Sequence, residues 1–438
     1  MLYERWRRIS ADRRNEMALR DAASGRHWTF SELFAAGANK KISSDTAIFP
    51  QGHSPEFILQ LLAGWREDQF ICPLEPGQPP PAVRSQISDL KSQIPDCVHL
   101  KTTSATGGTA RLVVFTAEQL AADAENIVAT MGLRADWPNL GVISMAHSYG
   151  FSNLVLPLLL HGIPLILAPA PLPEMVRRAA GNEKFITLAA VPAMWRAWHE
   201  AGSIPRNTRL AISAGAPLPL NLEKSVFEKA GVKIHNFLGS SECGGIAYDD
   251  SDSPRADAAH VGAPMRNVQL SLNANGCLAV RSRAVAESYW PEKSDSLGGG
   301  IFRTTDLAEL KGSQVFLRGR LGDLINVAGR KISPDAIERA LLSNPKVREC
   351  LVFGAPSNDA ERTEVIIAVV VAEAAEAELK HFLLETLPAW QVPREWRFVD
   401  SFSASARGKI SRARLRDAFI QNGPKAFDFP SAVGKMNP

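Results

Sequence analysis

Residues 101–116 gather side chains that suit a polyphosphate. They read K-T-T-S-A-T-G-G-T-A-R-L-V-V-F-T, with six hydroxyl residues, two glycines and Arg111 ahead of an apolar strand. Hydroxyls and a glycine-rich backbone offer hydrogen-bond donors, and the arginine adds a fixed positive charge. The stretch lacks the G-x-x-x-x-G-K-[ST] pattern of the common phosphate-binding loop. A surface loop without a ligand therefore stays the alternative.

Three further polar or glycine-bearing segments follow strands of an expected parallel sheet. Strand and helix patterns alternate between 140 and 238, which is typical of a parallel sheet covered by helices. Ligands of such sheets bind outside the carboxyl ends of the strands. Segments 147–150, 214–217 and 239–242 should therefore meet in one crevice. Taken singly, His147 and Glu242 could also be a backbone-bonded histidine and a solvated acid. The expected strands are 142–146, 164–168, 185–191, 208–213 and 232–238, and the expected helices are 150–161, 173–180, 192–201 and 218–230.

Two charged residues nearer the carboxyl end could also do chemistry. Asp306 closes the run I-F-R-T-T-D and could accept two hydrogen bonds from a diol such as ribose. A structural ion pair between Asp306 and Arg303 is the alternative. Lys409 sits on a glycine-bearing turn, A-R-G-K-I, where an ordinary exposed turn is the simpler interpretation.

Residues 319–338 separate two expected domains. Gly319 and Gly322 suit a backbone that bends, and Ser333 followed by Pro334 is typical of a helix start. We expect an α/β fold. An N-terminal domain, 1–321, would hold parallel α/β sheets and a small β-barrel-like unit with strands at 269–272 and 277–281. A small mobile α+β domain, 322–438, would follow, with strands at 347–353 and 365–372 and helices at 334–343, 375–386 and 411–420.

Composition favours small-molecule chemistry. The 438 residues carry a formal charge of only +3, so nothing indicates binding to nucleic acid or to a membrane surface. The five cysteines are scattered without metal-ligand spacing and predict reduced thiols. The charged amino terminus lacks a signal-peptide core, and the longest apolar run is broken by glycine and prolines. We therefore expect a cytoplasmic protein without a membrane span.

The motifs resemble those of the acyl-adenylate-forming enzymes, which include acyl- and aryl-CoA synthetases, adenylation domains of peptide synthetases and luciferases. The family's phosphate loop is similar to residues 103–111, and its asparagine-aromatic-glycine-threonine-glutamate signature is similar to 236–242. Its arginine-threonine-glycine-aspartate motif is similar to 303–306, its hinge to 319–338, and its carboxyl-terminal lysine to Lys409. The resemblance covers nearly the whole chain.

The resemblance implies a role for each matching residue. Mg²⁺ would be held by Glu242, the ribose hydroxyls by Asp306, and the adenine would lie along 215–217. Lys409 would reach the substrate carboxylate and the phosphate oxygens. The expected catalytic residues are Lys409, Glu242, His147 and Arg111. The expected ATP-binding residues are Thr103, Ser104, Thr106, Gly107, Gly108, Gly215, Ala216, Pro217, Asn236, Phe237, Leu238, Gly239, Ser240, Ser241, Asp306, Arg320 and Lys331.

Some positions depart from the family's pattern. The charges at Arg111, Glu242, Asp306 and Lys409 are kept, so we expect an active enzyme. The departures are Ala105 for glycine, Gly107 for threonine, Leu238 for an aromatic ring, Thr305 for glycine, Ser403 for proline, and Gly322 at a hinge position usually polar or charged.

The expected reaction is the ATP-dependent activation of a carboxylic acid to an acyl adenylate, followed by transfer to a thiol. Amino-acid-activating relatives place an aspartate near His147, and its absence favours an aromatic or medium-chain acid without an amino group. CoA is the simplest acceptor. The alternatives are a free acyl carrier protein as the acceptor, or a nucleotide-binding protein without catalysis.

Overall fold

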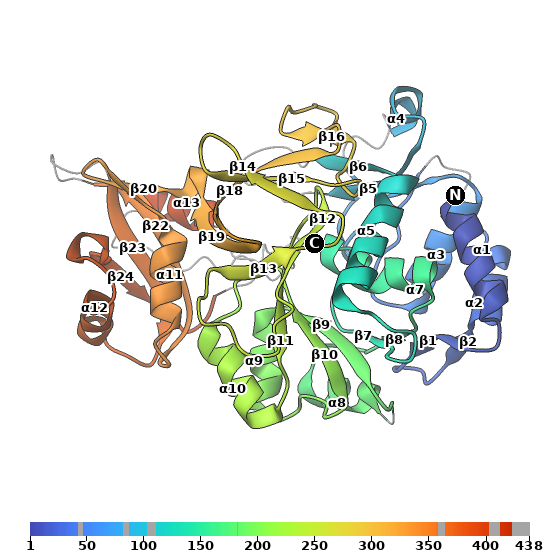
Figure 1. Ribbon diagram of the computed structural model, residues 1–438, viewed down its shortest axis with the longest axis horizontal. Coiled ribbons are helices and arrows are strands. Elements are labelled where there is room, and N and C mark those ends of the chain that lie inside the picture. Colours follow the sequence, from blue (N-terminus) through green and yellow to red (C-terminus); the bar gives the residue numbers. More distant parts are fainter. Residues whose placement is uncertain are drawn as a thin grey trace.

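The structure is a computed structural model that describes residues 1–42, 47–81, 87–102, 111–181, 183–357, 364–402 and 412–422. A large unit of sheets and helices carries a smaller C-terminal unit at one end, which lies at the left of Figure 1. The α/β fold class expected from the sequence is confirmed. The boundary between 321 and 322 stays a prediction.

One sheet of the large unit has five described strands in the order β16-β6-β5-β4-β3. Its parallel strands are β3 (Ala47–Ile48), β4 (Phe70–Ile71) and β5 (Cys97–Thr102), and its antiparallel strands are β6 (Leu112–Thr116) and β16 (Ser288–Trp290). The helices of this part of the chain are α1 (Leu2–Asp12), α2 (Phe30–Asn39), α3 (Pro55–Arg66), α4 (Ile87–Gln93) and α5 (Ala117–Met131). β16 comes from far along the chain and places Tyr289 opposite Val113.

The second sheet contains the predicted parallel strands. Their spatial order is β8-β7-β9-β10-β11, and all five residues of β9 are buried, as expected for a strand covered on both faces. These strands are β7 (Asn139–Gly141), β8 (Leu165–Leu167), β9 (Ile186–Ala190), β10 (Thr208–Ser213) and β11 (Ile234–Ser240), and β1 (Met17–Asp21) and β2 (His27–Thr29) extend the edge beside β8. The helical elements are α6 (Ser148–Gly150), the π-helix η2 (Phe151–Val155), α7 (Leu156–His161), α8 (Pro173–Ala180), α9 (Pro192–Glu200) and α10 (Leu220–Ala230).

The strand predicted over 142–146 is wrong. The strand is β7 and ends at Gly141, after which the chain turns toward the helix at Ser148. The Ser144 hydroxyl accepts a 3.2 Å hydrogen bond from the Ala146 amide and donates to Glu75. Such local side-chain bonds compete with a sheet ladder for the backbone.

The small β unit is antiparallel and continues the parallel sheet through β12, so the two share one hydrogen-bonded path. It begins at β12, next to β11, and passes through β13 to the long hairpin of β18 and β19. Its strands are β12 (Gly244–Tyr248), β13 (His260–Pro264), β14 (Gln269–Leu272), β15 (Cys277–Arg281), β17 (Leu297–Gly298), β18 (Ile301–Lys311) and β19 (Gln314–Arg320).

The C-terminal unit has its own apolar core. A cluster that includes Ile325, Ile337, Val352 and Leu379 is separate from the core of the large unit. Its strands are β20 (Ile325–Val327), β21 (Arg330–Ile332), β22 (Val347–Pro356), β23 (Glu364–Ala372) and β24 (Glu395–Phe398). Its helical elements are η3 (Leu321–Asp323), α11 (Pro334–Leu342), α12 (Glu376–Leu384), η4 (Ala389–Gln391) and α13 (Arg412–Asn422).

Arg412, the first residue of α13, binds three carboxylates at the start of this unit. Its guanidinium bonds to Asp323, to Asp335 Oδ1 at 2.6 Å and to Glu338 Oε1 at 2.9 Å. Its Nε also donates to the Val352 carbonyl over 2.9 Å. The end of the described chain is thereby tied to the segment that follows β19.

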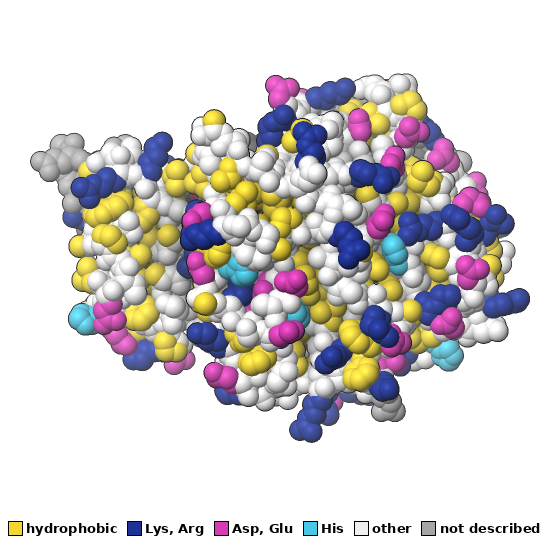
Figure 2. All heavy atoms as spheres, in the orientation of Figure 1, with side chains coloured by type: hydrophobic (Ala, Val, Ile, Leu, Met, Phe, Trp, Pro, Cys, Tyr) yellow, Lys and Arg dark blue, Asp and Glu magenta, His cyan; other side chains and the backbone are white. Residues whose placement is uncertain are grey.

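The surface carries both signs of charge. Figure 2 shows Lys and Arg side chains interspersed with Asp and Glu over one face, in keeping with the small net charge. None of the helices that the structure describes has the length and apolar composition of a membrane span.

Candidate active site

Tyr149 brings the segment 147–150 against the parallel sheet. Its hydroxyl donates to the Ala190 carbonyl at 3.4 Å and lies 3.3 Å from the Ile212 carbonyl, at the carboxyl ends of β9 and β10. The rings of Tyr149 and Phe237 are 5.9 Å apart, which adds β11 to the same neighbourhood.

The segment 214–217 leaves β10 at this edge of the sheet. Gly215, Ala216 and Pro217 are exposed, whereas Leu218 is buried and fixes the far end of the turn. Gly215 has a φ of +85°, which residues with a Cβ rarely adopt. The backbone of 215–217 is therefore accessible from solvent where the chain leaves β10.

The signature 236–242 runs from a buried strand into an accessible turn. Asn236 and Phe237 are buried in β11, so their side chains support the strand and do not face solvent. Leu238 and the serines 240 and 241 are half-buried, and Gly239 is exposed. The Ser240 hydroxyl accepts a 3.2 Å hydrogen bond from the Glu242 amide, which shapes the turn that presents Glu242.

Glu242 is held by Tyr289, a residue that the sequence interpretation missed. The Tyr289 hydroxyl donates to Glu242 Oε1 over 3.1 Å. The Arg111 guanidinium lies over the Tyr289 ring, 5.8 Å from its centre. Burial and the neighbouring Glu242 carboxylate raise the pKa of Tyr289, so it stays a hydrogen-bond donor at neutral pH. The structure thus brings the predicted Glu242 and Arg111 to the same tyrosine.

Asp123 anchors the turn from behind. This buried carboxylate accepts from the Gly245 amide at 3.1 Å and from the Ser152 hydroxyl at 2.6 Å. Gly244 has a φ of +67°, and a Cβ there would lie 2.0 Å from Asp123 Oδ1. A side chain at position 244 would therefore displace the carboxylate, and glycine is required.

Lys101 is a buried cation at the end of β5. The residue is 5% exposed, and its Nζ has no hydrogen-bond partner among the residues that the structure describes. The ammonium lies 4.3 Å from the centre of the Phe115 ring. Burial lowers the pKa of Lys101, while Asp123, Cys243 and Glu242 act in the opposite direction. A positive charge thus lies behind the glutamate turn.

His147 has an acidic neighbour. Its Nε2 lies 3.1 Å from Glu75 Oε1, and the Ser144 hydroxyl donates to the same carboxylate oxygen over 2.6 Å. Glu75 follows β4, so it joins the two sheets of the large unit at this point. The sequence interpretation placed His147 at the end of a strand but did not identify this carboxylate.

Asp306 pairs with Arg320 across the β18–β19 hairpin. Arg320 Nε donates to Asp306 Oδ1 over 2.9 Å, and the two residues are register partners. The alternative ion pair with Arg303 is not the one formed, because Arg303 donates to the Asp295 carbonyl at 3.0 Å. The Asp306 side chain is 23% exposed, which leaves it partly accessible.

Gly319, near the end of β19, lies against Ser333 at the start of α11. A Cβ on Gly319 would lie 2.0 Å from Ser333 Oγ. Ser333 occupies the predicted N-cap of α11, but its hydroxyl makes no capping bond. The predicted N-cap position is therefore confirmed, but the Ser333 hydroxyl is packed against Gly319 and does not bond to the helix amides. Lys331 lies exposed on β21, opposite Asn326.

Part of the predicted site lies outside the described residues. These positions are Thr103, Ser104, Thr106, Gly107, Gly108 and Lys409. Their assignments stay predictions from the sequence.

A metal ion that is bound partly by a ligand needs only one or two carboxylates from the protein. Among the described ranges no group of three or more His, Cys, Asp and Glu side chains could hold a metal ion. Mg²⁺ commonly takes one or two carboxylates together with substrate phosphates and water. A single carboxylate such as Glu242, half-buried just after β11, fits that pattern.

Sequence signals for the missed residues differ in strength. Lys101 is a charged residue within a mostly buried strand, directly before the hydroxyl-rich stretch, and this is a visible signal. Tyr289, Asp123 and Glu75 had no such signal, because each reaches the site through strand pairing or packing between distant segments.

Known proteins share both the sequence pattern and the fold. Residues 92–290 match the family "AMP-binding enzyme", and 336–409 match the "AMP-binding enzyme C-terminal domain". The 2,3-dihydroxybenzoate-AMP ligase of Bacillus subtilis is 25% identical over 385 residues, which are 82% of this chain and 70% of that protein. The 2-succinylbenzoate–CoA ligase of Bacillus thuringiensis is 26% identical over 331 residues, 72% of this chain and 68% of that protein.

A solved structure extends the likeness to the fold. The o-succinylbenzoate CoA synthetase of Bacillus subtilis, in complex with its acyl-adenylate intermediate, superimposes with a TM-score of 0.81 at 20% identity. The match covers 94% of this chain and 98% of that one. With both family domains matched in order along the chain, the protein belongs to the AMP-binding enzymes, the acyl-adenylate-forming family.

Proposed function

We propose that the protein is an acid–thiol ligase that uses ATP to activate an aromatic or medium-chain carboxylic acid and then transfers the acyl group to a thiol. One observation carries the proposal: the Glu242 carboxylate, at the end of the family's glutamate signature, is held by Tyr289 with the Arg111 guanidinium beside it. In this proposal the Glu242 carboxylate shares a metal ion with the phosphates of ATP. The Arg111 guanidinium supplies a positive charge near the same turn.

In the first step a carboxylate oxygen of the acid attacks the α-phosphorus of ATP. The bond from that phosphorus to the bridging oxygen breaks, and pyrophosphate leaves. We assign Arg111 and Lys409 to the negative charge on the phosphate oxygens. When bound, Mg²⁺ would neutralise part of the same charge, and Glu242 would hold it.

ATP would be positioned by two separate parts of the large unit and by Lys331 of the C-terminal unit. The exposed backbone of 215–217 would lie along the adenine, and Asp306 would accept hydrogen bonds from the ribose hydroxyls. Because Arg320 already donates to Asp306 Oδ1, it would orient this carboxylate for the ribose. Lys331 is assigned to the nucleotide on the resemblance alone.

In the second step the thiol sulfur attacks the acyl carbonyl carbon. The bond between that carbon and the phosphate oxygen breaks, AMP leaves, and the thiol proton passes to solvent. CoA is the acceptor that we favour, and the name of the Bacillus thuringiensis relative supports it. A free acyl carrier protein is the alternative acceptor.

We propose that an aromatic acid is a better substrate than an aliphatic acid. Both relatives are named for benzoates. In this chain the ring of Tyr149 and the His147–Glu75 pair lie at the carboxyl edge of the sheet, where the acid would enter. Reduced cysteines support the cytoplasm as the location, since the four in the large unit are buried and unpaired.

Acid-dependent exchange of radiolabelled pyrophosphate into ATP tests the first step. A panel of benzoates, cinnamates and medium-chain fatty acids should contain at least one acid that supports exchange, and added CoA should convert it to a thioester. ATP binding without exchange for every acid would favour a nucleotide-binding protein without catalysis.

A further inference from the structure

Four charged side chains form a buried network beside the proposed adenine segment. The side chains of Glu223, Asp249 and Arg255 are at most 1% exposed, and that of Lys233 is 7% exposed. The formal charges cancel, two acids against two bases. Buried ion pairs of this kind contribute little net stability, because desolvation of the charges offsets their attraction. We therefore ask which backbone groups these side chains hold in place.

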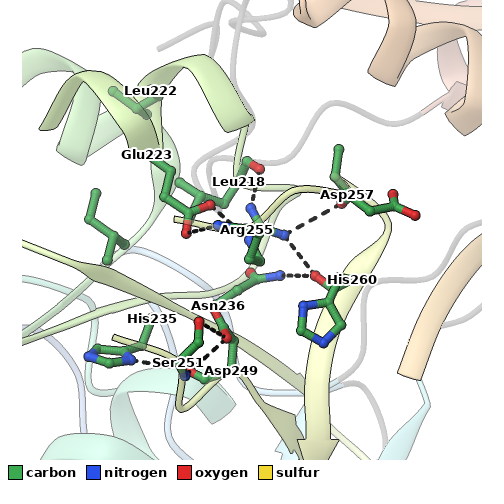
Figure 3. A network of polar contacts seen from close by, with 12 residues as sticks. Leu218, Leu222, Glu223, His235, Asn236, Asp249, Ser251, Arg255, Asp257 and His260 are labelled. Atoms are coloured by element: carbon green, nitrogen blue, oxygen red, sulfur yellow. Dashed lines mark hydrogen bonds and ion pairs between the residues drawn. The ribbon is translucent and has the colours of Figure 1, made fainter. Parts of the chain in front are cut away.

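Arg255 connects the network to two backbone carbonyls, as Figure 3 shows. Its Nε donates to Glu223 Oε2 over 2.8 Å. One terminal nitrogen donates to the Leu218 carbonyl at 2.7 Å, and the other donates to the His260 carbonyl at 2.7 Å. The planar guanidinium therefore fixes three acceptors in one plane.

Each of these carbonyls is next to a residue assigned to the nucleotide. Leu218 directly follows Pro217, the end of the exposed segment proposed for the adenine. The His260 carbonyl also accepts a 3.1 Å hydrogen bond from Asn236 Nδ2, the first residue of the glutamate signature. One side chain thus ties the adenine segment after β10 to the strand that leads to Glu242 (Figure 3).

Lys233 belongs to the same network but makes different contacts. Its ammonium donates to Glu223 Oε1 and Asp249 Oδ2, each at 2.7 Å, and to the Ile234 carbonyl at 2.8 Å. These acceptors lie at the start of β11 or outside the proposed site. Removal of Lys233 would disturb the buried charges as removal of Arg255 does, without freeing the Leu218 or His260 carbonyl.

We propose that Arg255 is a positioning residue for the nucleotide: it sets the place of segment 215–217 relative to β11, and so determines affinity for the adenine ring of ATP. This inference rests on the proposed function, because it takes 215–217 as the adenine contact. A carboxylic acid bound near His147 would not sense Arg255 directly.

The test compares Arg255→Lys with the matched control Lys233→Met. Lysine keeps the charge opposite Glu223 but cannot donate to three acceptors in one plane. We expect Arg255→Lys to raise KM for ATP about tenfold, with KM for the acid changed less than about twofold, since displaced contacts weaken binding of the group they face. Lys233→Met should lower the melting temperature yet leave KM for ATP nearly unchanged.

Hydrogen exchange gives a readout independent of turnover. Amides of 214–218 should exchange faster in Arg255→Lys than in wild type, and those in Lys233→Met should not. If Arg255→Lys does not fold, Glu223→Gln replaces it, because the amide oxygen still accepts from Arg255 Nε but holds the guanidinium less firmly. A smaller rise in KM for ATP is then expected.

The outcomes separate this inference from the proposed function. If the wild-type protein shows exchange activity and Arg255→Lys has the same KM for ATP, the positioning role is overturned and the ligase proposal stays intact. Equal rises in KM for ATP in Arg255→Lys and Lys233→Met would also overturn it, since the effect would then be general loosening. Wild-type protein that binds ATP without exchange activity would sink the ligase proposal. The ATP affinity and the hydrogen exchange of the variants would still decide the role of Arg255.

Discussion

The hydroxyl of Tyr289 donates a 3.1 Å hydrogen bond to Oε1 of Glu242, although 47 positions separate the two residues in sequence. Tyr289 reaches this place because β16 pairs with β6, whose amino end follows Arg111. The contact leaves the carboxylate with a fixed orientation. Partners of this kind commonly tune how well a carboxylate binds a metal ion.

Tyr289→Phe should therefore weaken the response to Mg²⁺. Without the hydroxyl the Glu242 carboxylate can rotate, and the Mg²⁺ concentration for half-maximal ATP–pyrophosphate exchange should rise about tenfold. The phenylalanine ring still lies under Arg111, so exchange at saturating Mg²⁺ should be close to that of wild type. An unchanged Mg²⁺ titration would show that the hydrogen bond has no part in metal binding.

Glu242→Gln should abolish most Mg²⁺-dependent exchange while the protein stays folded. The amide can still accept from Tyr289, but it carries no charge to balance the metal. A loss of at least about 100-fold is expected, as for removal of a group that holds charge in the transition state. Circular dichroism and the melting temperature provide the folding control. Normal exchange would remove Glu242 from the site.

Asp306→Ala should weaken ATP binding. Two charge-assisted hydrogen bonds to a diol would be lost, which corresponds to roughly 3–6 kcal/mol, and Arg320 would lose its partner. Titration calorimetry with ATP measures the change, and Arg303→Ala is the matched control because Arg303 bonds to the Asp295 carbonyl instead. Equal ATP affinity in Asp306→Ala and wild type would contradict the ribose assignment.

Much of the fold could be predicted because its elements are local patterns. β10, α8, β14 and β15 begin and end at the predicted residues, since alternation and helix periodicity are set within each segment. β7 was misplaced because Ser144 and Glu75, distant in sequence, bond to each other and turn the chain away from the sheet. Ser333 is the N-cap residue of α11, as predicted, but its hydroxyl is packed against Gly319, a contact that no local pattern showed.

The candidate site was only half visible in the sequence. Glu242, Asp306 and Arg111 stand in recognisable motifs, whereas Tyr289 and Asp123 act through contacts across 47 and 122 positions. The ion pair between Asp306 and Arg303, the alternative that the sequence left open, does not form for a related reason. Hairpin register places Arg320, and not the nearby Arg303, opposite Asp306.

Lys101→Met should stabilise the fold while reducing activity. The buried ammonium lacks a hydrogen-bond partner among the described residues, so an apolar side chain of similar length should raise the free energy of unfolding at pH 7 by roughly 1–3 kcal/mol. Exchange should fall if the positive charge behind the Glu242 turn assists phosphate binding. Chemical denaturation and exchange assays measure the two effects.

The pH dependence provides the control for Lys101. Burial lowers its pKa in the folded state below the ordinary value of 10.5. The cost of the buried charge is complete below the folded-state pKa and shrinks as the pH rises through it, because the folded protein then releases a proton that the unfolded chain keeps. The stability difference between Lys101→Met and wild type should narrow as the pH rises. A constant difference from pH 7 to 10 would contradict a charge effect.

Gly322→Pro should separate the two half-reactions. Gly322 lies in η3, and a Cβ there would meet no atom within 4 Å, so Gly322→Ala is a control that fits the present conformation. Proline fixes φ near about −65° and would block rotation at this point. We expect Gly322→Pro to keep acid-dependent exchange but lose thioester formation, and Lys409→Ala to lose exchange but still transfer a preformed acyl adenylate. Equal losses in both steps for each variant would contradict two orientations of the C-terminal unit.

The ion pairs of Arg412 limit where such a rotation can occur. Arg412 holds Asp323 together with Asp335 and Glu338, so Asp323 must travel with the C-terminal unit. On the other side, Arg320 is paired with Asp306 of the large unit. Leu321 and Gly322 lie between the two pairs, so a movement that keeps both pairs would turn the backbone mainly there. The C-terminal unit can then rotate relative to the large unit but cannot separate from it. The connection is a short pivot with an ion-paired residue on each side.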